Sequence, residues 1–328
     1  MIKTLLFAVA LCFTFCTVVE AQSQDVFSTL QENVWYLKTA DTKARLYVTE
    51  IGEGSPVVFL HGGPGNDFNY IVDALLPHLR EHRFILFDQR GSVLSPVSPE
   101  AVPSLSLDVL VEDLEQLRQA LGEEKLTLFA HSFGTVVAEA YFIKYPQHVR
   151  SMVLAASAPP VGEFSSVLAA TRPRMKLLRE RPLVATVLQN EHLAGSPDTL
   201  TDRQRSMRGR IRDASIDIVH LDRWRQVYGG GVYYNDKVGD AIGGSLPAQI
   251  DMAASLQTHT VPITIIDGDQ DFLDPAGQGW KQTASLHPNI KVDVLPSAGH
   301  YAWIDAPAEF AKDLSAGLAQ SGTSSTTP

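Results

Sequence analysis

The chain has 328 residues, of which 45% are hydrophobic and 20% are charged, and its net charge at pH 7 is −10. This length exceeds one small core and falls short of two full domains, so one large core with an inserted lobe fits best. The negative charge argues against a nucleic-acid partner, because contacts with phosphates need a positive face.

The N-terminus has the pattern of a cleaved signal peptide. Lys3 precedes an apolar run over residues 4–19, and Val19-Glu20-Ala21 places small or aliphatic residues at the two positions that a signal peptidase reads. A membrane anchor is the alternative, but the run is shorter than the roughly 20 residues of a spanning helix. We therefore expect residues 1–21 to be removed and the protein to be secreted or periplasmic, with no stable membrane anchor afterwards.

Both cysteines, Cys12 and Cys16, lie inside this N-terminal segment. The mature chain would therefore contain no disulfide, no thiol nucleophile and no thiolate metal site. No zinc-ligand spacing occurs in the rest of the sequence. At the other end, residues 319–328 are rich in Ser, Thr and Gly and are expected to be disordered.

From residue 34 onwards the hydrophobic pattern predicts an alternation of strands and helices. Two edge strands at 34–38 and 44–50 flank a turn, and a continuous apolar run at 57–60 suits a buried parallel strand. The units that follow are a helix at 70–81, a strand at 83–87, a helix at 106–121, a strand at 125–130, a helix at 135–144 and a strand at 149–155. Such a run of right-handed βαβ units predicts a doubly wound, mostly parallel sheet.

The alternation stops between residues 159 and 258, where helical patterns occur without clear strands. It resumes with a strand at 260–266, a helix at 278–286, a strand at 290–295 and a helix at 307–318. We therefore predict a core formed by residues 22–158 and 259–318, with an inserted, mainly helical cap at 159–258.

The stretch 126–135 places Ser132 in a turn between a strand and a helix. Such an elbow strains one residue and projects its side chain above the strand ends, with the helix N-terminus beneath it. Small residues must flank it two positions to either side, and Ala130 and Gly134 meet that need. The pattern indicates a nucleophile at Ser132, unless this is a chance Ser-x-Gly.

The loop His61-Gly62-Gly63-Pro64-Gly65 follows an earlier predicted strand. Its glycines would let a backbone N–H approach a reacting carbonyl oxygen, so the N–H groups of Gly63 and Phe133 are candidates for an oxyanion hole. A Gly-Pro turn without a ligand is the alternative. We interpret His61 as structural, because its neighbours fix the shape of the loop.

An activated serine needs a base, and the base needs a carboxylate that orients it. Asp271 and His300 each follow the end of a predicted strand. The order Ser, Asp, His at strand ends is the one that the α/β-hydrolase fold requires, and ligands bind at that edge of open α/β sheets. We therefore predict this fold, with Ser132 as nucleophile, His300 as base and Asp271 as acid. Two rival candidates for the acid lie in the same loop, Asp269 and Asp274.

Three short motifs are distinctive: His61-Gly62-Gly63-Pro64-Gly65, Asp88-Gln89-Arg90-Gly91-Ser92 and His131-Ser132-Phe133-Gly134. Together they resemble the proline iminopeptidase family of α/β hydrolases, and the resemblance covers roughly residues 34–158 and 260–318. It implies a serine peptidase that releases an N-terminal residue, often proline, from a short peptide through an acyl-enzyme, with no metal or organic cofactor. The site residues that it implies are Ser132, Asp271, His300, Gly63 and Phe133.

The sequence departs from this family at several points. Asn66-Asp67 follow the first motif, where family members often have more glycine, and Val93-Leu94-Ser95 replace the usual Gly-x-Ser after the second. The family's cap carries Glu residues, one beside a Trp, that pair with the substrate ammonium, but Trp224 lies here between Arg223 and Arg225. The cap arginines either form solvated helix faces or attract an anionic substrate.

Two alternatives to the aminopeptidase therefore stay open. One is a carboxylesterase or lactonase that acts on a small ester with the same catalytic residues. The other is a ligand-binding protein that kept the fold without turnover, although a complete Ser, Asp and His set argues against it. Under both enzyme hypotheses, the binding partner is a small-molecule or short-peptide substrate.

Overall fold

The computed structural model describes residues 29–227 and 235–320. The predicted signal peptide at 1–21 and nearly all of the predicted disordered tail lie outside these ranges. Within them, no helix combines the length and the apolar character needed to cross a membrane.

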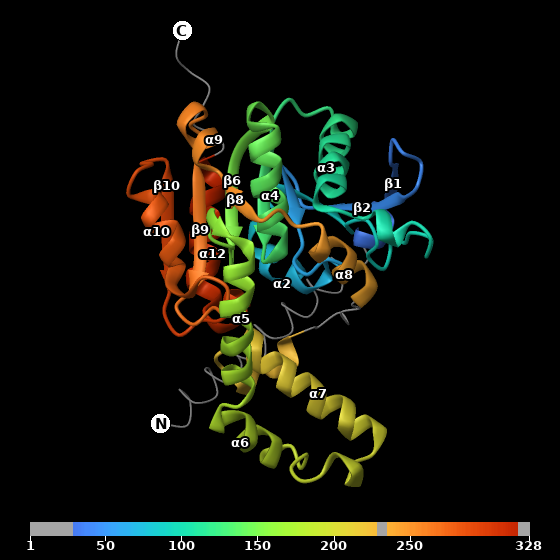
Figure 1. The fold of residues 1–328 in the computed structure, drawn as a ribbon, viewed down its shortest axis with the longest axis vertical. Helices are drawn as coiled ribbons and strands as arrows, with labels where there is room; N and C mark the ends of the chain where they lie inside the picture. Colours follow the sequence, from blue (N-terminus) through green and yellow to red (C-terminus); the bar gives the residue numbers. More distant parts are fainter. Residues whose placement is uncertain (1–28, 228–234, 321–328) are drawn as a thin grey trace, which may run out of the picture.

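An eight-stranded sheet forms the centre of the molecule, in the order β1-β2-β4-β3-β5-β6-β9-β10 (Figure 1). β1 and β4 each pair with β2 in antiparallel fashion, and all pairs from β4 to β10 are parallel. The predicted doubly wound, mostly parallel sheet is confirmed. Of the two strands predicted to lie at an edge, β1 does so, whereas β2 lies inside the sheet between β1 and β4. The strands are β1 (Trp35–Lys38), β2 (Arg45–Ile51), β3 (Ser55–Leu60), β4 (His82–Phe87), β5 (Leu126–His131), β6 (Val149–Ala155), β9 (Ile263–Gly268) and β10 (Ile290–Leu295).

Helices cover both faces of this sheet. Along β3, Val57 and Phe59 join the hydrophobic cluster on one face, whereas Val58 and Leu60 join that on the other, as the two-residue period of a buried strand requires. The first face is covered by α2 (Val72–Leu75), α11 (Ala302–Asp305) and α12 (Pro307–Ala319). The second is covered by α3 (Leu107–Leu121), α4 (Phe133–Lys144) and α10 (Gln278–Ala284).

Local signals explain where helices begin and end. The side chain of Ser106 accepts a hydrogen bond from the Val109 amide at the start of α3, and Gly122 ends that helix in the left-handed conformation at φ 72°. The segment predicted as one helix at 70–81 is helical from residue 69 to residue 78, but it is not a single α-helix. The chain forms a 3-10 turn at Asn69–Ile71, then α2, then a second 3-10 turn at Leu76–His78. Pro77 lacks the N–H that would continue an α-helix there.

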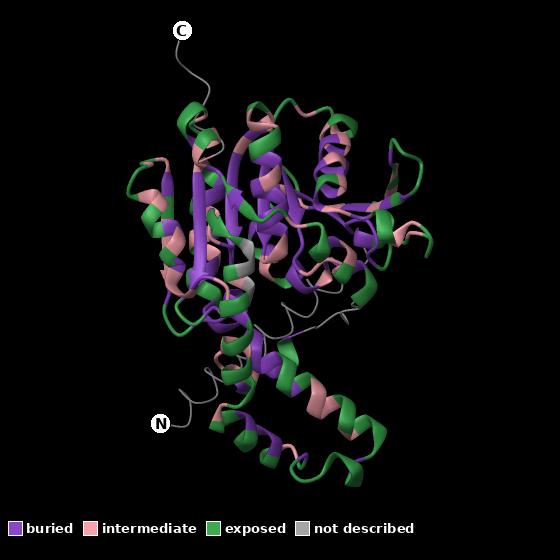
Figure 2. Cartoon of the chain, in the orientation of Figure 1, coloured by how far each residue is buried: buried purple, intermediate pink, exposed green. Residues whose placement is uncertain are grey.

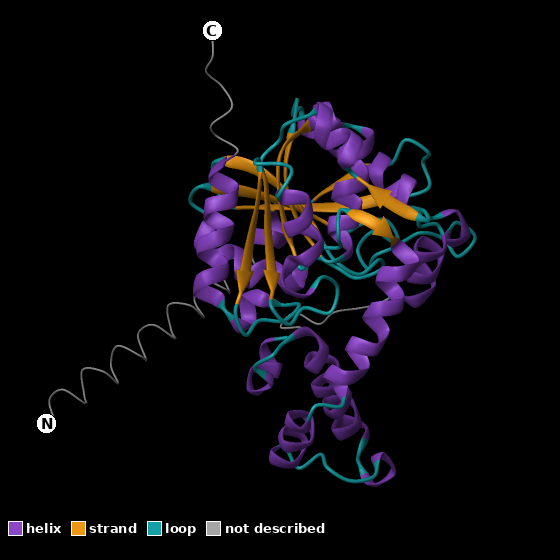
Figure 3. Ribbon diagram, turned by 60° about the vertical axis from the view of Figure 1, so that its left-hand side comes forward, coloured by secondary structure: helices purple, strands orange, loops and turns teal. Residues whose placement is uncertain are grey.

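The insert between β6 and β9 divides into two parts. In the first, α5 (Phe164–Arg179), α6 (Pro182–Asn190) and α7 (Asp202–Asp217) project from the core, as Figures 1 and 3 show, and their outer surfaces are largely exposed in Figure 2. The second returns to the core, where Val238 and Ile242 are buried. It holds α8 (Asp236–Gly244) and α9 (Ala253–Thr258).

A short antiparallel pair stands at the base of the insert, β7 (Val161–Glu163) with β8 (Gln249–Asp251). It escapes prediction because three residues are too few to establish a period of two.

Candidate active site

Ser132 lies in a sharp turn between β5 and α4. Its backbone has φ 54° and ψ −125°, a conformation that costs a non-glycine residue about 1–3 kcal/mol and persists only where the surroundings impose it. The surroundings are tight: a Cβ added to Gly134 would lie 2.1 Å from the carbonyl oxygen of Leu60. The predicted elbow is therefore present, and glycine two residues after Ser132 is a steric requirement.

The loops after β9 and β10 bring Asp271 and His300 to Ser132. The Ser132 hydroxyl lies 2.8 Å from Nε2 of His300, and Nδ1 of His300 lies 2.7 Å from Oδ2 of Asp271. Because the carboxylate can only accept, Nδ1 carries the proton and Nε2 is left to accept from the serine. Both the imidazole and the carboxylate are buried, and the ring of Phe272 packs 4.2 Å from that of His300.

The other two candidates for the acid, Asp269 and Asp274, bind backbone amides. Oδ1 of Asp269 accepts a hydrogen bond of 3.2 Å from the Ala298 amide, which ties the acid loop to the base loop. The carboxylate of Asp274 accepts from the amide of Gly279, at 3.0 Å, near the start of α10. Of the three candidates for the acid, Asp271 is the one that contacts the imidazole within the described residues.

The glycine loop after β3 lies directly against the nucleophile. A Cβ on Gly62 would lie 2.8 Å from the Cβ of Ser132, so a side chain at this position would displace the loop. Gly63 has φ 56°, and its carbonyl accepts from the Asn66 amide at 2.9 Å in a tight turn. Within the described residues, no group accepts a hydrogen bond from the amides of Gly63 or Phe133. Both amides are therefore available as donors beside Ser132.

His61 joins the first two motifs to each other, in keeping with a structural role. Its Nε2 accepts from the Gln89 amide at 2.9 Å, and the Gln89 side chain donates to the His61 carbonyl at 2.7 Å. Burial lowers the pKa of His61 to about 4, so the ring is neutral near pH 7. Arg90 of the second motif, also buried, forms a two-pronged ion pair with Asp113 of α3.

Several cap arginines bind backbone carbonyls, a role that neither sequence interpretation foresaw. Arg174 donates to the carbonyls of Phe272 and Leu273 in the acid loop, at 3.1 and 3.2 Å. Arg181 donates to the carbonyls of Ser215 and Ile218, at 2.8 and 2.9 Å. The first pair of contacts fastens α5 to the acid loop, and the second fastens the start of α6 to the end of α7.

A cap arginine beside Trp224 is also bound within the chain, in this case by a carboxylate. The guanidinium of Arg225 lies 4.4 Å from the Trp224 ring and pairs with both carboxylate oxygens of Glu191, at 2.8 and 2.6 Å. The indole Nε1 of Trp224 lies 3.4 Å from Oε1 of Glu191, so this glutamate is near the tryptophan and is paired with an arginine of the same chain.

Sequence reasoning missed the anchor of the base loop, Asp305. Its carboxylate accepts from the amide of Gly299 at 2.8 Å and from those of Val219 and His220 at 2.8 and 2.9 Å. One buried side chain thus holds both the loop of His300 and the chain that leaves α7. A carboxylate inside a short apolar helix was the one available signal.

The described residues contain no group of three or more His, Cys, Asp or Glu side chains placed to hold a metal ion. The candidate site brings together a hydroxyl, an imidazole, a carboxylate and two backbone amides at the carboxyl edge of a parallel sheet. That arrangement defines a class of protein, the α/β hydrolases with a Ser-His-Asp set.

Residues 55–307 match the family described as alpha/beta hydrolase fold, and the chain belongs to it. A proline iminopeptidase of Heyndrickxia coagulans is 38% identical over 113 residues, which are 34% of this chain and 38% of the relative. The chain thus matches well under two thirds of that relative. A cis-3-alkyl-4-alkyloxetan-2-one decarboxylase of Shewanella oneidensis is 28% identical over 272 residues, 80% of this chain and 81% of the relative.

Solved structures agree with these relatives. A proline iminopeptidase-related protein of Thermus thermophilus superposes with a TM-score of 0.62 at 29% identity, covering 88% of this chain and 97% of its own. An esterase of Thermogutta terrifontis reaches 0.63 at 20% identity, covering 88% and 99%, which shows the shared fold. The predicted resemblance to proline iminopeptidase-like hydrolases is confirmed, within a family that has peptidase and esterase members.

Proposed function

We propose that the protein is a serine hydrolase that forms an acyl-enzyme on Ser132 and releases an N-terminal residue, such as proline, from short peptides. One observation carries the first part: the hydroxyl of Ser132, the imidazole of His300 and the carboxylate of Asp271 form a line of hydrogen bonds of 2.8 and 2.7 Å. Similarity to proline iminopeptidases supports the second part.

In the proposed reaction, the substrate carbonyl carbon lies beside Oγ of Ser132. Nε2 of His300 takes the hydroxyl proton as Oγ attacks, while Asp271 holds the ring tautomer and stabilises the imidazolium. The amides of Gly63 and Phe133 donate to the oxyanion, and loss of one such donor typically costs about 2.7–4 kcal/mol. His300 then protonates the leaving amine, and water releases the acyl group by the same steps.

A second candidate is an esterase or lactonase that uses the same residues. The relative from Shewanella oneidensis aligns with 80% of this chain, cap included, and the oxetan-2-one in its name is a four-membered cyclic ester. The iminopeptidase of Heyndrickxia coagulans aligns with only 34%. We infer that residues of the cap choose between amide and ester, and on this basis the longer alignment favours an ester or lactone substrate as the alternative.

The test combines a fluorophosphonate probe with three chromogenic substrates: prolyl p-nitroanilide, its N-acetylated form and p-nitrophenyl acetate. We expect the probe to label the protein, and we expect cleavage of the anilide with a free amine but not of the acetylated one. Ser132→Ala should abolish labelling and turnover. Ser151→Ala is the matched control, because Ser151 is a buried serine whose hydroxyl has no described partner, and it should keep both.

Each part of the proposal can fail separately. Rapid ester cleavage with negligible turnover of the prolyl anilide would reject the aminopeptidase and leave the second candidate. No labelling, while a control hydrolase is labelled, would reject both and leave a ligand-binding protein. Export is proposed as well, and N-terminal sequencing of the exported protein should then begin at Gln22.

A further inference from the structure

A chain of buried hydrogen bonds links the glycine loop to the backbone of the base. The Gly62 amide donates to the hydroxyl of Tyr70 at 2.5 Å, and that hydroxyl lies 2.9 Å from Nδ1 of His131. On the other side of the ring, Nε2 of His131 lies 3.1 Å from the carbonyl oxygen of His300. Tyr70 and His131 are 7% and 1% exposed, so both side chains are buried.

Only one arrangement of protons satisfies every member of this chain. The carbonyl of His300 can only accept, so Nε2 of His131 must carry the proton and Nδ1 must accept. The hydroxyl of Tyr70 then accepts from the Gly62 amide and donates its single proton to Nδ1. The direction of donation runs without conflict from Gly62 to His300.

The histidine of this chain stays neutral beside the base. Burial, followed by the nearby charge of His300, lowers the pKa of His131 well below its usual value. The two imidazole rings are 4.8 Å apart. A neutral ring at this position adds no second positive charge next to the imidazolium that His300 becomes during acyl transfer.

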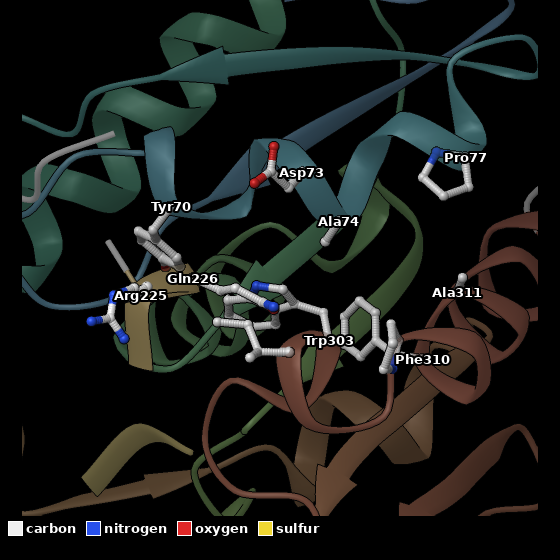
Figure 4. A pocket seen from close by; sticks show the side chains of 11 residues that line it. Tyr70, Asp73, Ala74, Pro77, Arg225, Gln226, Trp303, Phe310 and Ala311 are labelled. Atoms are coloured by element: carbon white, nitrogen blue, oxygen red, sulfur yellow. The ribbon is translucent and has the colours of Figure 1, made fainter. Parts of the chain in front are cut away.

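The tyrosine is fixed by its ring as well as by its hydroxyl. Its ring stacks on Tyr301 at 5.4 Å and 8° and on Trp303 at 6.0 Å. Figure 4 shows Tyr70 and Trp303 together on the wall of a pocket of about 390 Å³, which Phe310 also lines. Replacing this tyrosine with phenylalanine therefore removes the two hydrogen bonds of the hydroxyl and leaves the stack and the pocket wall in place.

We propose that Tyr70 and His131 are positioning residues that hold the glycine loop and the base, His300, at fixed positions on either side of Ser132. The proposal rests on the proposed serine hydrolase function. Because Tyr70 occupies the amide of Gly62, it leaves the next amide, that of Gly63, as the donor beside Ser132. The same chain ends on the backbone of the residue whose ring accepts the Ser132 proton.

Loss of the chain should act on the transition state more than on substrate binding, because the oxyanion and the imidazolium exist only after attack has begun. A displacement of about 1 Å in such a site can cost about a hundredfold in rate. We therefore expect Tyr70→Phe to lower kcat by about 10- to 100-fold, with KM changed less than about threefold.

The test measures kcat, KM and the rate of fluorophosphonate labelling for wild type, Tyr70→Phe and His131→Leu. Concentrations are set by active-site titration and folding is checked by circular dichroism. His131→Gln keeps one acceptor and one donor, so it should recover part of the rate lost in His131→Leu. Tyr141→Phe is the matched control: it removes a buried hydroxyl that donates to Glu115 of α3 at 2.8 Å, and it should keep the wild-type kcat.

A double variant tests whether the two residues act as one chain. Once Tyr70→Phe has broken it, His131→Leu should add little, so the combined loss should be well below the product of the single losses. Any of three results would overturn the proposal. The single losses could simply multiply in the double variant, kcat for Tyr70→Phe could stay within twofold of wild type, or His131→Gln could be no more active than His131→Leu. A wild type inert to the probe would overturn the proposed function and this inference together. Reactive wild type with unchanged variants would overturn the inference alone.

Discussion

Gly268, the last residue of β9, separates the loops that carry the acid and the base. A Cβ added there would lie 2.2 Å from the carbonyl oxygen of Ala298 and 2.6 Å from that of Gly299. An ordinary contact is about 3.5 Å, so the two loops must part by about 1 Å in Gly268→Ala. Overpacking of this kind costs about 1–3 kcal/mol of unfolding free energy. A shift of that size between Asp271 and His300 should lower kcat/KM about a hundredfold.

Urea unfolding followed by circular dichroism gives the stability, and p-nitrophenyl acetate hydrolysis gives the rate at a temperature where the variant is fully folded. Gly209→Ala in α7 is the matched control, because nothing lies within 4 Å of the added Cβ. It should raise stability by a few tenths to about 1 kcal/mol, as alanine does inside helices, and keep the rate. A folded Gly268→Ala with the wild-type rate would refute the reasoning, since the loops would then have absorbed the methyl group without moving the two side chains.

Three further predictions follow from the contacts of single carboxyl groups. Asp271→Asn should lower kcat by about 10⁴, because the amide favours the wrong tautomer of the base. Asp269 accepts a hydrogen bond from the backbone amide of Ala298, so Asp269→Asn should lose far less, and steady-state kinetics of both variants decides this. Burial raises the pKa of Glu139 well above its usual value, and neither of its oxygens has a described partner. Only the unfolded state then ionises as pH rises above about 4.3, so wild type loses stability by up to about 1.4 kcal/mol per pH unit in that window. Glu139→Gln should therefore gain on wild type between pH 5 and pH 8 in urea titrations, and an equal difference at both values would contradict this. Asp305→Asn should lower the free energy of unfolding by about 1–3 kcal/mol. It should also lower kcat, because one of the three amides that donate to Asp305, that of Gly299, adjoins the base. An unchanged kcat in the folded variant would show that this anchor does not position the base.

The core of the fold was predictable because its signals are local. β6 was predicted at its observed bounds, Val149–Ala155, and the helix predicted at 106–121 differs from α3 (Leu107–Leu121) by one residue. Buried parallel strands are continuous apolar runs, and a helix packed on one face has a period of 3.6 residues. Prediction failed where elements are too short for a period, as in β7, or where proline breaks an apolar helix, as at Pro77.

The positions of Ser132, Asp271 and His300 were predictable for a different reason. The carboxyl ends of parallel strands meet at one edge of the sheet, and each of the three residues follows such a strand end. Their supporting contacts leave weaker signals. His131 belongs to the motif His131-Ser132-Phe133-Gly134, but its partner Tyr70 lies in a 3-10 turn whose sequence carries no functional motif. A hydroxyl that meets an imidazole from another element depends on the tertiary fold, and no spacing along the chain encodes it.

The cap illustrates the limit most clearly. Its contacts with the catalytic loops run through backbone groups: Arg174 donates to carbonyls of the acid loop, and Asp305 accepts from the amides of Val219 and His220. Any non-proline residue supplies an amide, so positions 219 and 220 of the cap can change their side chains and still donate to Asp305, whereas the contact with the acid loop needs the guanidinium of Arg174. The cap sequence is therefore free to diverge at those two positions around a fixed anchor. Relatives that share the core fold carry the names of a peptidase, an esterase and a decarboxylase, so the fold alone does not define the reaction.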